Sequence, residues 1–154
     1  MAGKDNKKRK PNSKSPEYGV SGIGGIFFKC KDPEKMKAWY KEHLGFKTDK
    51  FGSLFEWRES LDPDHKAYTS WNPFSENSHY FAPSEKEYMI NYRVRDLKKL
   101  LEKLGKEGVE IMGKMETFEY GRFAWIIDPE GNKIELWEPV DEVFTDMYRG
   151  KTIR

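Results

Sequence analysis

Apolar and polar positions follow the same order twice along the chain. In the first half, residues 23–31 are predicted to form a strand, and Asp32 and Pro33 then open a helix as N-cap and first helical residue. The helix over residues 34–44 has an apolar stripe at helical spacing and ends at Gly45. Its members are Met36, Trp39, Tyr40 and either His43 or Leu44. Residues 46–48, 54–58 and 67–71 are predicted as short strands.

The second half starts the pattern again after residues 72–87, whose Pro, Ser, Asn and Glu content is typical of a loop. A strand over residues 89–95 is followed by Asp96, which is the expected N-cap of a helix with leucines at positions 97, 100, 101 and 104. The remaining strand predictions are residues 109–112, 116–118, 122–127 and 133–137.

Individual residues repeat as well as the pattern. The segment from Phe28 to Asp32 matches the segment from Tyr92 to Asp96 at an offset of 64 positions. Ser70-Trp-Asn-Pro73 similarly matches Leu136-Trp-Glu-Pro139. The repeat predicts two copies of a strand, helix and three-strand module, at about residues 22–74 and 88–139.

The last predicted hairpin contains an isolated acid. Asp128-Pro-Glu-Gly-Asn132 has the composition of a tight turn. On the strand that follows, alternation places Glu135 and Trp137 on one face, and Ile134 and Leu136 on the other. Buried carboxylates are uncommon unless they are paired or bound to a ligand. Glu135 is therefore predicted either to bind a ligand or to form an internal ion pair.

With this repeat, the chain resembles the vicinal oxygen chelate superfamily, which includes glyoxalase I, extradiol dioxygenases, methylmalonyl-CoA epimerase and the bleomycin- and fosfomycin-resistance proteins. The resemblance covers about residues 22–140. It rests on Trp39-Tyr-Lys-Glu-His-Leu-Gly-Phe46 and on Asp128-Pro-Glu-Gly-Asn-Lys-Ile-Glu-Leu136. It implies an α+β fold in which two βαβββ modules pair curved mixed sheets around a cavity.

Enzymes of this superfamily usually hold a divalent metal through the first and last strands of each module. Counting from the helix caps, the resemblance places these positions at Gly25, Met89, near Thr69 and at Glu135. Only Glu135 is a suitable ligand, and protein-bound cations generally need three or more donors. The three histidines are predicted elsewhere, His43 on a helix, His65 in a turn and His79 in a loop. We therefore expect no tightly bound catalytic metal.

Strand alternation also predicts the cavity lining. Phe27, Lys29, Asn91 and Arg93 are expected on the cavity face, where Arg93 or Lys29 is a candidate partner for Glu135. The aromatic residues either line a pocket for a flat apolar ligand or pack beneath the helices. Alternation favours the cavity for Trp71 and Trp137 and leaves the face of Trp125 open. Trp57 and Tyr120 complete the predicted lining.

Composition narrows the class of protein. The chain has 154 residues, which suits one domain, and a net charge of +2, which gives no reason to expect nucleic-acid binding. The single cysteine excludes an internal disulfide, and no apolar run is long enough to span a membrane. A cytoplasmic location is the default expectation.

The two ends of the chain differ in character. Residues 1–19 are basic and nearly without apolar side chains, so they are predicted to form a disordered tail. Residues 141–154 carry Val143, Phe144, Met147 and Tyr148 at helical spacing. They are expected to form a helix that docks across the cavity mouth or onto a second subunit, and the superfamily resemblance implies a homodimer.

The leading functional prediction is a metal-free protein of the glyoxalase and bleomycin-resistance type that binds a small organic molecule. Glu135, Asn91 and Arg93 are the expected polar anchors, and Trp71 and Trp137 the walls. One alternative is a lyase, isomerase or dioxygenase that uses a divalent metal or Glu135 as general base. The other is an interaction module that works through the two ends of the chain.

Overall fold

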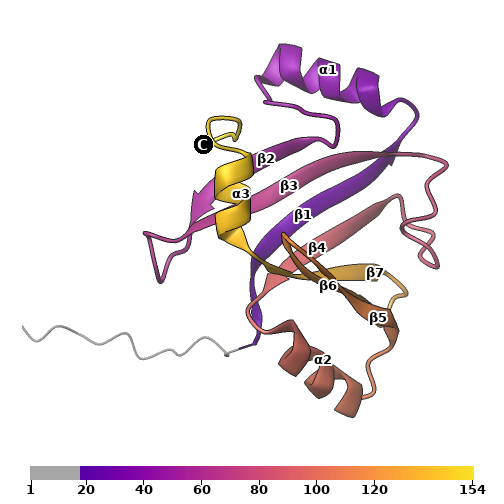
Figure 1. Cartoon of the computed structure of the whole chain (residues 1–154). Coiled ribbons are helices and arrows are strands. Elements are labelled where there is room, and N and C mark those ends of the chain that lie inside the picture. Colours follow the sequence, from indigo (N-terminus) through magenta and orange to yellow (C-terminus); the bar gives the residue numbers. More distant parts are fainter. Residues whose placement is uncertain (1–17) are drawn as a thin grey trace, which may run out of the picture.

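The computed structural model describes residues 18–154, which form one curved, open mixed sheet with three helices (Figure 1). The predicted tail lies almost entirely outside the described residues. The strands are ordered β2-β3-β1-β4-β7-β6-β5 across the sheet. Their bounds are β1 Val20–Cys30, β2 Ser53–Arg58, β3 Lys66–Ser75, β4 Tyr88–Val94, β5 Ile111–Phe118, β6 Gly121–Ile127 and β7 Lys133–Pro139. The helices are α1 Pro33–Leu44, α2 Leu97–Lys106 and α3 Asp141–Met147.

The sheet consists of two modules joined through their first strands. β1 and β4 pair antiparallel at the centre, while β3 runs parallel to β1 and β7 runs parallel to β4. This confirms the predicted α+β repeat, with two differences in the strands. Residues 46–48 contribute only an isolated bridge from Thr48 to Ser53, so the first module has one strand fewer than predicted. The two strands predicted over residues 109–118 form the single strand β5.

Local sequence signals account for the helix ends. The Asp32 side chain accepts a hydrogen bond from the Lys35 amide, and the Asp96 side chain accepts one from the Lys99 amide. Both caps satisfy amide groups that have no partner within the helix. Gly45 ends α1 at φ 70°, in the left-handed region that glycine tolerates best.

The two longer helices cover one face of the sheet. Beneath α2, the buried core is made of Val94, Leu97, Leu100, Ala124 and Leu136. Beneath α1, Tyr40 packs on Trp71 with ring centroids 4.5 Å apart. Only part of the predicted α1 stripe is buried, since Trp39 is 50% exposed and Leu44 is 57% exposed.

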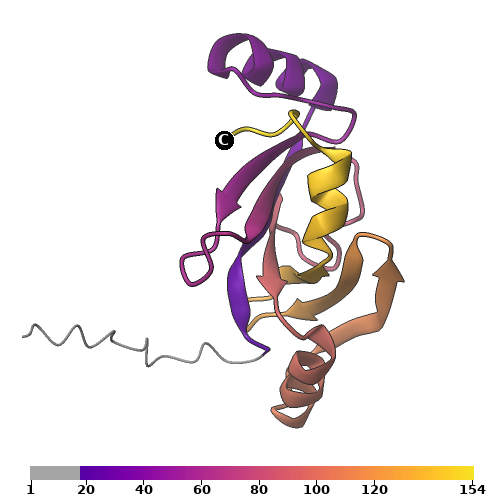
Figure 2. The same ribbon diagram turned by 60° about the vertical axis from the view of Figure 1, so that its left-hand side comes forward.

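The third helix lies on the opposite, concave face, between the two halves of the sheet (Figure 2). Its Phe144 contacts Trp137 of β7 and Tyr68 of β3, with ring centroids 5.1 and 5.8 Å apart. The chain then returns to the sheet edge, where the Ile153 amide donates a hydrogen bond to the Leu54 carbonyl oxygen. Within residues 18–154, every helix is too short to cross a lipid bilayer.

Candidate functional site

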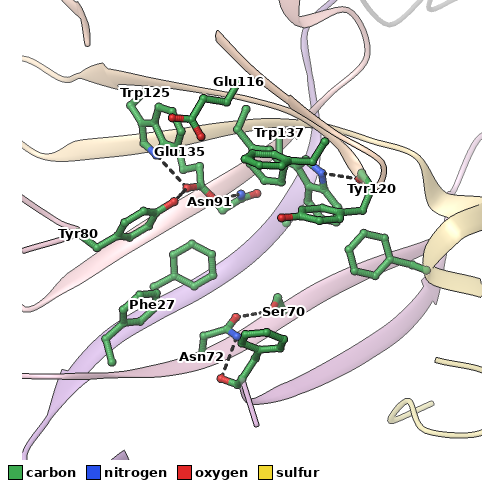
Figure 3. A pocket seen from close by; sticks show the side chains of 16 residues that line it. Phe27, Ser70, Asn72, Tyr80, Asn91, Glu116, Tyr120, Trp125, Glu135 and Trp137 are labelled. Carbon is green, nitrogen blue, oxygen red and sulfur yellow. Dashed lines mark hydrogen bonds between the residues drawn. The ribbon is translucent and has the colours of Figure 1, made fainter. Parts of the chain in front are cut away.

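The concave face holds a cavity of about 470 Å³ between the two modules (Figure 3). Ten of its sixteen lining residues are aromatic, and they come from both modules, from the loop after β3 and from α3. The lining consists of Gly24, Phe27, Phe51, Ser70, Asn72, Phe74, Tyr80, Asn91, Glu116, Phe118, Tyr120, Phe123, Trp125, Glu135, Trp137 and Phe144.

Glu135 is the buried carboxylate of this cavity, with only 3% of its surface exposed. Three neighbours donate hydrogen bonds to it. The Asn91 amide nitrogen lies 2.6 Å from Oε1, while Trp125 Nε1 lies 2.8 Å from Oε2 and the Tyr80 hydroxyl donates to the same oxygen (Figure 3). Glu135 is thus held by neutral donors and by no arginine or lysine of the described chain.

Burial decides the electrostatics of this group. Removal from water raises the pKa of Glu135 above its ordinary value of 4.5, although the bonds from Tyr80, Asn91 and Trp125 act in the opposite direction. The pKa of the Tyr80 hydroxyl is also raised, first by burial and then by the nearby Glu135 charge. The hydroxyl therefore remains a hydrogen-bond donor at neutral pH.

Strand register identifies the position in the first module that corresponds to Glu135. Asn91 pairs with Glu135 across β4 and β7, and Phe27 pairs with Asn72 across β1 and β3. Phe27 and Asn91 are 64 positions apart, the same offset as the two helix caps. The position equivalent to Glu135 is therefore Asn72, and the sequence-based placement near Thr69 was wrong.

The first module contributes neutral polar groups to the cavity. The Asn72 amide nitrogen donates to the Phe51 carbonyl oxygen at 3.1 Å, and the Ser70 hydroxyl donates to Asn72 Oδ1. Together with Phe27 and Asn91, these residues line the cavity opposite and beside Glu135. Within residues 18–154, no group of three or more His, Cys, Asp or Glu side chains is arranged to hold a metal ion.

Stacked aromatic pairs build the rest of the wall. Phe118 and Tyr120 are parallel with ring centroids 5.4 Å apart, and both are partly exposed at the rim. Phe123 stacks on Trp137 at 5.9 Å. On the opposite side, Phe74 stacks on Tyr80 at 5.5 Å. Flat apolar surfaces thus surround the single buried carboxylate.

Five of the predicted site residues line this cavity. Alternation placed Glu135 and Trp137 of β7 on the same face, and the structure has both there. The others are Phe27, Asn91 and Tyr120. Trp125, whose face alternation left open, also points into the cavity and bonds to Glu135.

Arg93 was expected at the cavity as the partner of Glu135, and the structure corrects this. The side chain is 1% exposed and forms a two-pronged ion pair with Asp141 of α3, at 2.9 and 2.5 Å. It does lie on the predicted face of β4, but farther along the strand and beneath α3. Alternation identifies a face without saying how far along the strand the cavity extends.

Lys29, Trp57 and Trp71 are also absent from the lining. The Lys29 ammonium lies 5.6 Å from the ring centre of Phe81, which is also outside the lining. Trp57 donates from Nε1 to Thr69 Oγ1 at 2.9 Å and covers Arg93. Trp71 points to the helix-covered face, because Ser70 and Asn72 on either side of it face the cavity.

Tyr80 is the functional candidate that sequence analysis missed. It lies between β3 and β4, in a segment with loop composition, so neither alternation nor helical spacing indicates its direction. The one available signal was an aromatic pair, Tyr80 and Phe81, in an otherwise polar loop. Phe81 is fully buried and fixes the loop, which brings the Tyr80 hydroxyl to Glu135.

Comparison with solved structures places this fold among known ones. Methylmalonyl-CoA epimerase from Mycobacterium tuberculosis superposes with a TM-score of 0.54 at 20% identity, covering 82% of this chain and 93% of the epimerase. A variant epimerase from Streptomyces coelicolor, in complex with 2-nitronate-propionyl-CoA, gives 0.59 at 14% identity, covering 79% and 99%. At such identities the likeness concerns the fold alone.

Sequence comparisons give the family. A search of curated proteins gave no match. A family model described as the glyoxalase/bleomycin resistance protein/dioxygenase superfamily matches residues 22–136, which is most of the chain. That span contains most of both modules, the Asp32 and Asp96 caps and Glu135. The chain therefore belongs to the glyoxalase/bleomycin resistance protein/dioxygenase superfamily.

Proposed function

We propose that this protein is a metal-free binding protein for a small organic molecule with a flat apolar body and one hydrogen-bonding group. The observation that carries the proposal is the cavity itself, in which aromatic walls surround one buried carboxylate. Small-molecule sites are typically concave and mostly apolar, with a few polar groups that orient the ligand. A volume of about 470 Å³ lies within the range of such sites.

Donor chemistry supports the metal-free part of the proposal. Among the cavity residues nearest to Glu135 in the strand register, Phe27 has no ligand atom, and Asn72 and Asn91 are neutral amides engaged with other groups. Both oxygens of Glu135 already accept hydrogen bonds. A divalent cation needs several oxygen, nitrogen or sulfur ligands, and hard cations prefer charged oxygens. One carboxylate that already accepts three hydrogen bonds from neutral donors is a poor match.

Acid-base isomerisation is the second candidate function. It is favoured by one observation, the raised pKa of a buried Glu135 that faces a cavity, because a general base works best with a pKa near the working pH. The three hydrogen bonds to Glu135 argue against a role as general base, because they stabilise the carboxylate and reduce its basicity. Incubation of a bound carbonyl compound in D₂O tests it: Glu135-dependent deuterium uptake at the adjacent carbon would establish the isomerase.

Ligand binding is tested by calorimetric titration of planar aromatic compounds against the wild type and two matched variants. Tyr120→Ala removes a partly exposed ring from the cavity rim, and Trp39→Ala removes a partly exposed ring from α1, outside the cavity. We expect Tyr120→Ala to weaken binding about tenfold, since an aromatic contact contributes about 0.5–1.5 kcal/mol beyond the area it buries. Trp39→Ala should bind as the wild type does.

Equal affinities for the two variants and the wild type would place binding outside this cavity and overturn the proposal. The metal-free part is tested by elemental analysis of protein purified without chelators. A stoichiometric divalent metal that Glu135→Gln loses would contradict it.

A further inference from the structure

The charges that line the cavity are of one sign. Its two carboxylates are Glu135 and Glu116, and none of the lining residues of the described chain is Lys, Arg or His. Both carboxylates act on the Tyr80 hydroxyl, whose pKa each of them raises. The two acids therefore lie at the same end of the cavity, next to Tyr80 (Figure 3).

The basic residues nearest to Glu135 are engaged elsewhere. Arg93 is bound to Asp141, and Lys29 lies against the Phe81 ring. Lys133 is outside the lining and donates to the Tyr80 carbonyl oxygen at 2.8 Å, with its ammonium 5.2 Å from the Tyr80 ring centre and 5.7 Å from the Trp125 ring centre. Its charge lowers the pKa of Glu135 without forming an ion pair with it. Within residues 18–154, Glu135 forms no ion pair, which is unusual for a carboxylate buried to this degree.

The hydrogen-bonding capacity around Glu135 is also incomplete. A carboxylate offers about four acceptor positions, and three are in use: Oε2 accepts from Tyr80 and Trp125, and Oε1 accepts only from Asn91. The carbonyl oxygen of the 98% buried Asn91 side chain has no hydrogen-bond partner. Glu135 Oε1 and the Asn91 side-chain oxygen can thus each accept another hydrogen bond. This end of the cavity therefore lacks a hydrogen-bond donor.

The cavity walls suit a positive charge as well. Aromatic faces attract cations through their quadrupoles, most strongly where water is excluded. Tyr80, Trp125 and Phe74 surround the end at which Glu135 lies. The protein already uses this interaction for its own Arg93, whose guanidinium carbon is 5.4 Å from the ring centres of both Trp57 and Trp137.

We infer that the ligand is an organic cation, a planar aromatic body that carries a protonated amine, amidine or quaternary ammonium group, with its charge at Glu135 and Glu116. This inference rests on the proposed function, because it assigns the class of ligand bound in the same cavity. The cation supplies the ion-pair partner that Glu135 lacks, and the aromatic body lies in the cavity against the wall formed by Phe118, Tyr120, Phe123 and Trp137.

Three naphthalenes of nearly equal size test the charge directly. They are 2-naphthylmethyl-trimethylammonium, which is a cation, 2-naphthylmethanol, which is neutral, and 2-naphthoate, which is an anion. In calorimetric titrations of the full chain at pH 7.5, we expect the cation to bind at least tenfold more tightly than the alcohol. The anion should bind more weakly than the alcohol.

Two glutamate variants locate the charge effect. Glu116→Gln removes the exposed acid of the cavity, and we expect it to reduce the ratio of cation to alcohol affinity about threefold. Glu119→Gln is the matched control on the same hairpin, outside the lining, and should keep the wild-type ratio. Glu135→Gln keeps Glu116 and should lower the ratio to about three. Its thermal melt is recorded alongside, and if it does not fold, Glu116→Gln and the wild-type series decide.

The outcomes separate this inference from the proposed function. Equal binding of the cation and the alcohol, with both weakened by Tyr120→Ala, overturns the cation inference and leaves the cavity as the binding site. Tighter binding of the anion overturns the inference in the same way. If none of the three compounds binds, both the inference and the proposed function are overturned.

Discussion

Arg93 of β4 and Asp141 of α3 form a buried, two-pronged ion pair, with Nη1–Oδ1 and Nη2–Oδ2 distances of 2.9 and 2.5 Å. The guanidinium lies between the rings of Trp57 and Trp137, and His65 Nε2 contacts Asp141 Oδ2 at 2.9 Å. The pair attaches the start of α3 to the centre of the sheet. Because Phe144 of α3 lines the cavity, a contact outside the cavity helps to set its shape.

Asp141→Asn is expected to destabilise the protein by about 3–5 kcal/mol, because removing one partner leaves the buried Arg93 charge uncompensated. Urea unfolding followed by tryptophan fluorescence measures this. Asp146→Asn on the same helix is the control, since it disrupts only an exposed pair with Arg149 and should leave the midpoint nearly unchanged. Equal effects of the two substitutions would show that the buried pair does not hold α3.

Glu135 should make stability depend on pH. Its pKa is raised above 4.5 in the folded state, so the folded protein binds its proton more tightly than the unfolded chain does. The stabilising contribution is complete below about pH 4.5 and is lost as the pH rises through the folded-state pKa. Comparing unfolding free energies of the wild type and Glu135→Gln from pH 4 upward tests this. As the pH rises, the unfolding free energy of the wild type should fall relative to that of Glu135→Gln. A difference that stays constant with pH would contradict the raised pKa of Glu135.

Tyr80→Phe isolates one of the three bonds to Glu135. The hydroxyl donates to the carboxylate and lowers its pKa, so its removal should raise the pKa of Glu135 further. We expect stability at neutral pH to fall by about 1.5–3 kcal/mol, the usual contribution of a hydrogen bond to a charged group. A ¹³C NMR titration of the Glu135 carboxyl measures the pKa. Tyr120→Phe removes a hydroxyl from the same cavity without touching Glu135, and a shift of similar size there would refute the specific role of Tyr80.

Gly24→Ala tests how closely β1 approaches the site. A Cβ atom at this position would lie 2.1 Å from Asn91 Oδ1 and 2.9 Å from the Trp137 ring. We expect Asn91 to be displaced from Glu135, with a loss of about 1–3 kcal/mol in stability and weaker ligand binding. Gly105→Ala is the control, because its Cβ would meet only Ile111 at 3.8 Å and alanine favours a helix. Wild-type stability and affinity in Gly24→Ala would show that a methyl group fits between β1 and Asn91 without displacing it.

Local patterns in the sequence were sufficient for the elements and for part of the site. These patterns involve only a few neighbouring residues, so they can be recognised in the sequence without knowing the fold. They are the helix caps Asp32 and Asp96, the turn before β7 and the alternation along β7. For this reason Glu135 and Trp137 were placed on the cavity face, and the repeat predicted two modules. The family resemblance of the same motifs indicated the fold class.

The three-dimensional structure decided which side chains meet. Matching Trp71 to Trp137 by sequence implied an offset of 66 positions, whereas strand register gives 63 between Asn72 and Glu135. The two offsets differ by three residues, and a shift by an odd number of residues moves a side chain to the other face of its strand. Trp71 therefore packs under α1, and Asn72 faces the cavity. Arg93 found its partner 48 residues away in α3, and Glu135 received a hydroxyl from a loop 55 residues earlier. Short-range periodicity specifies the direction of a side chain along its own strand, but its partners depend on how distant segments pack together.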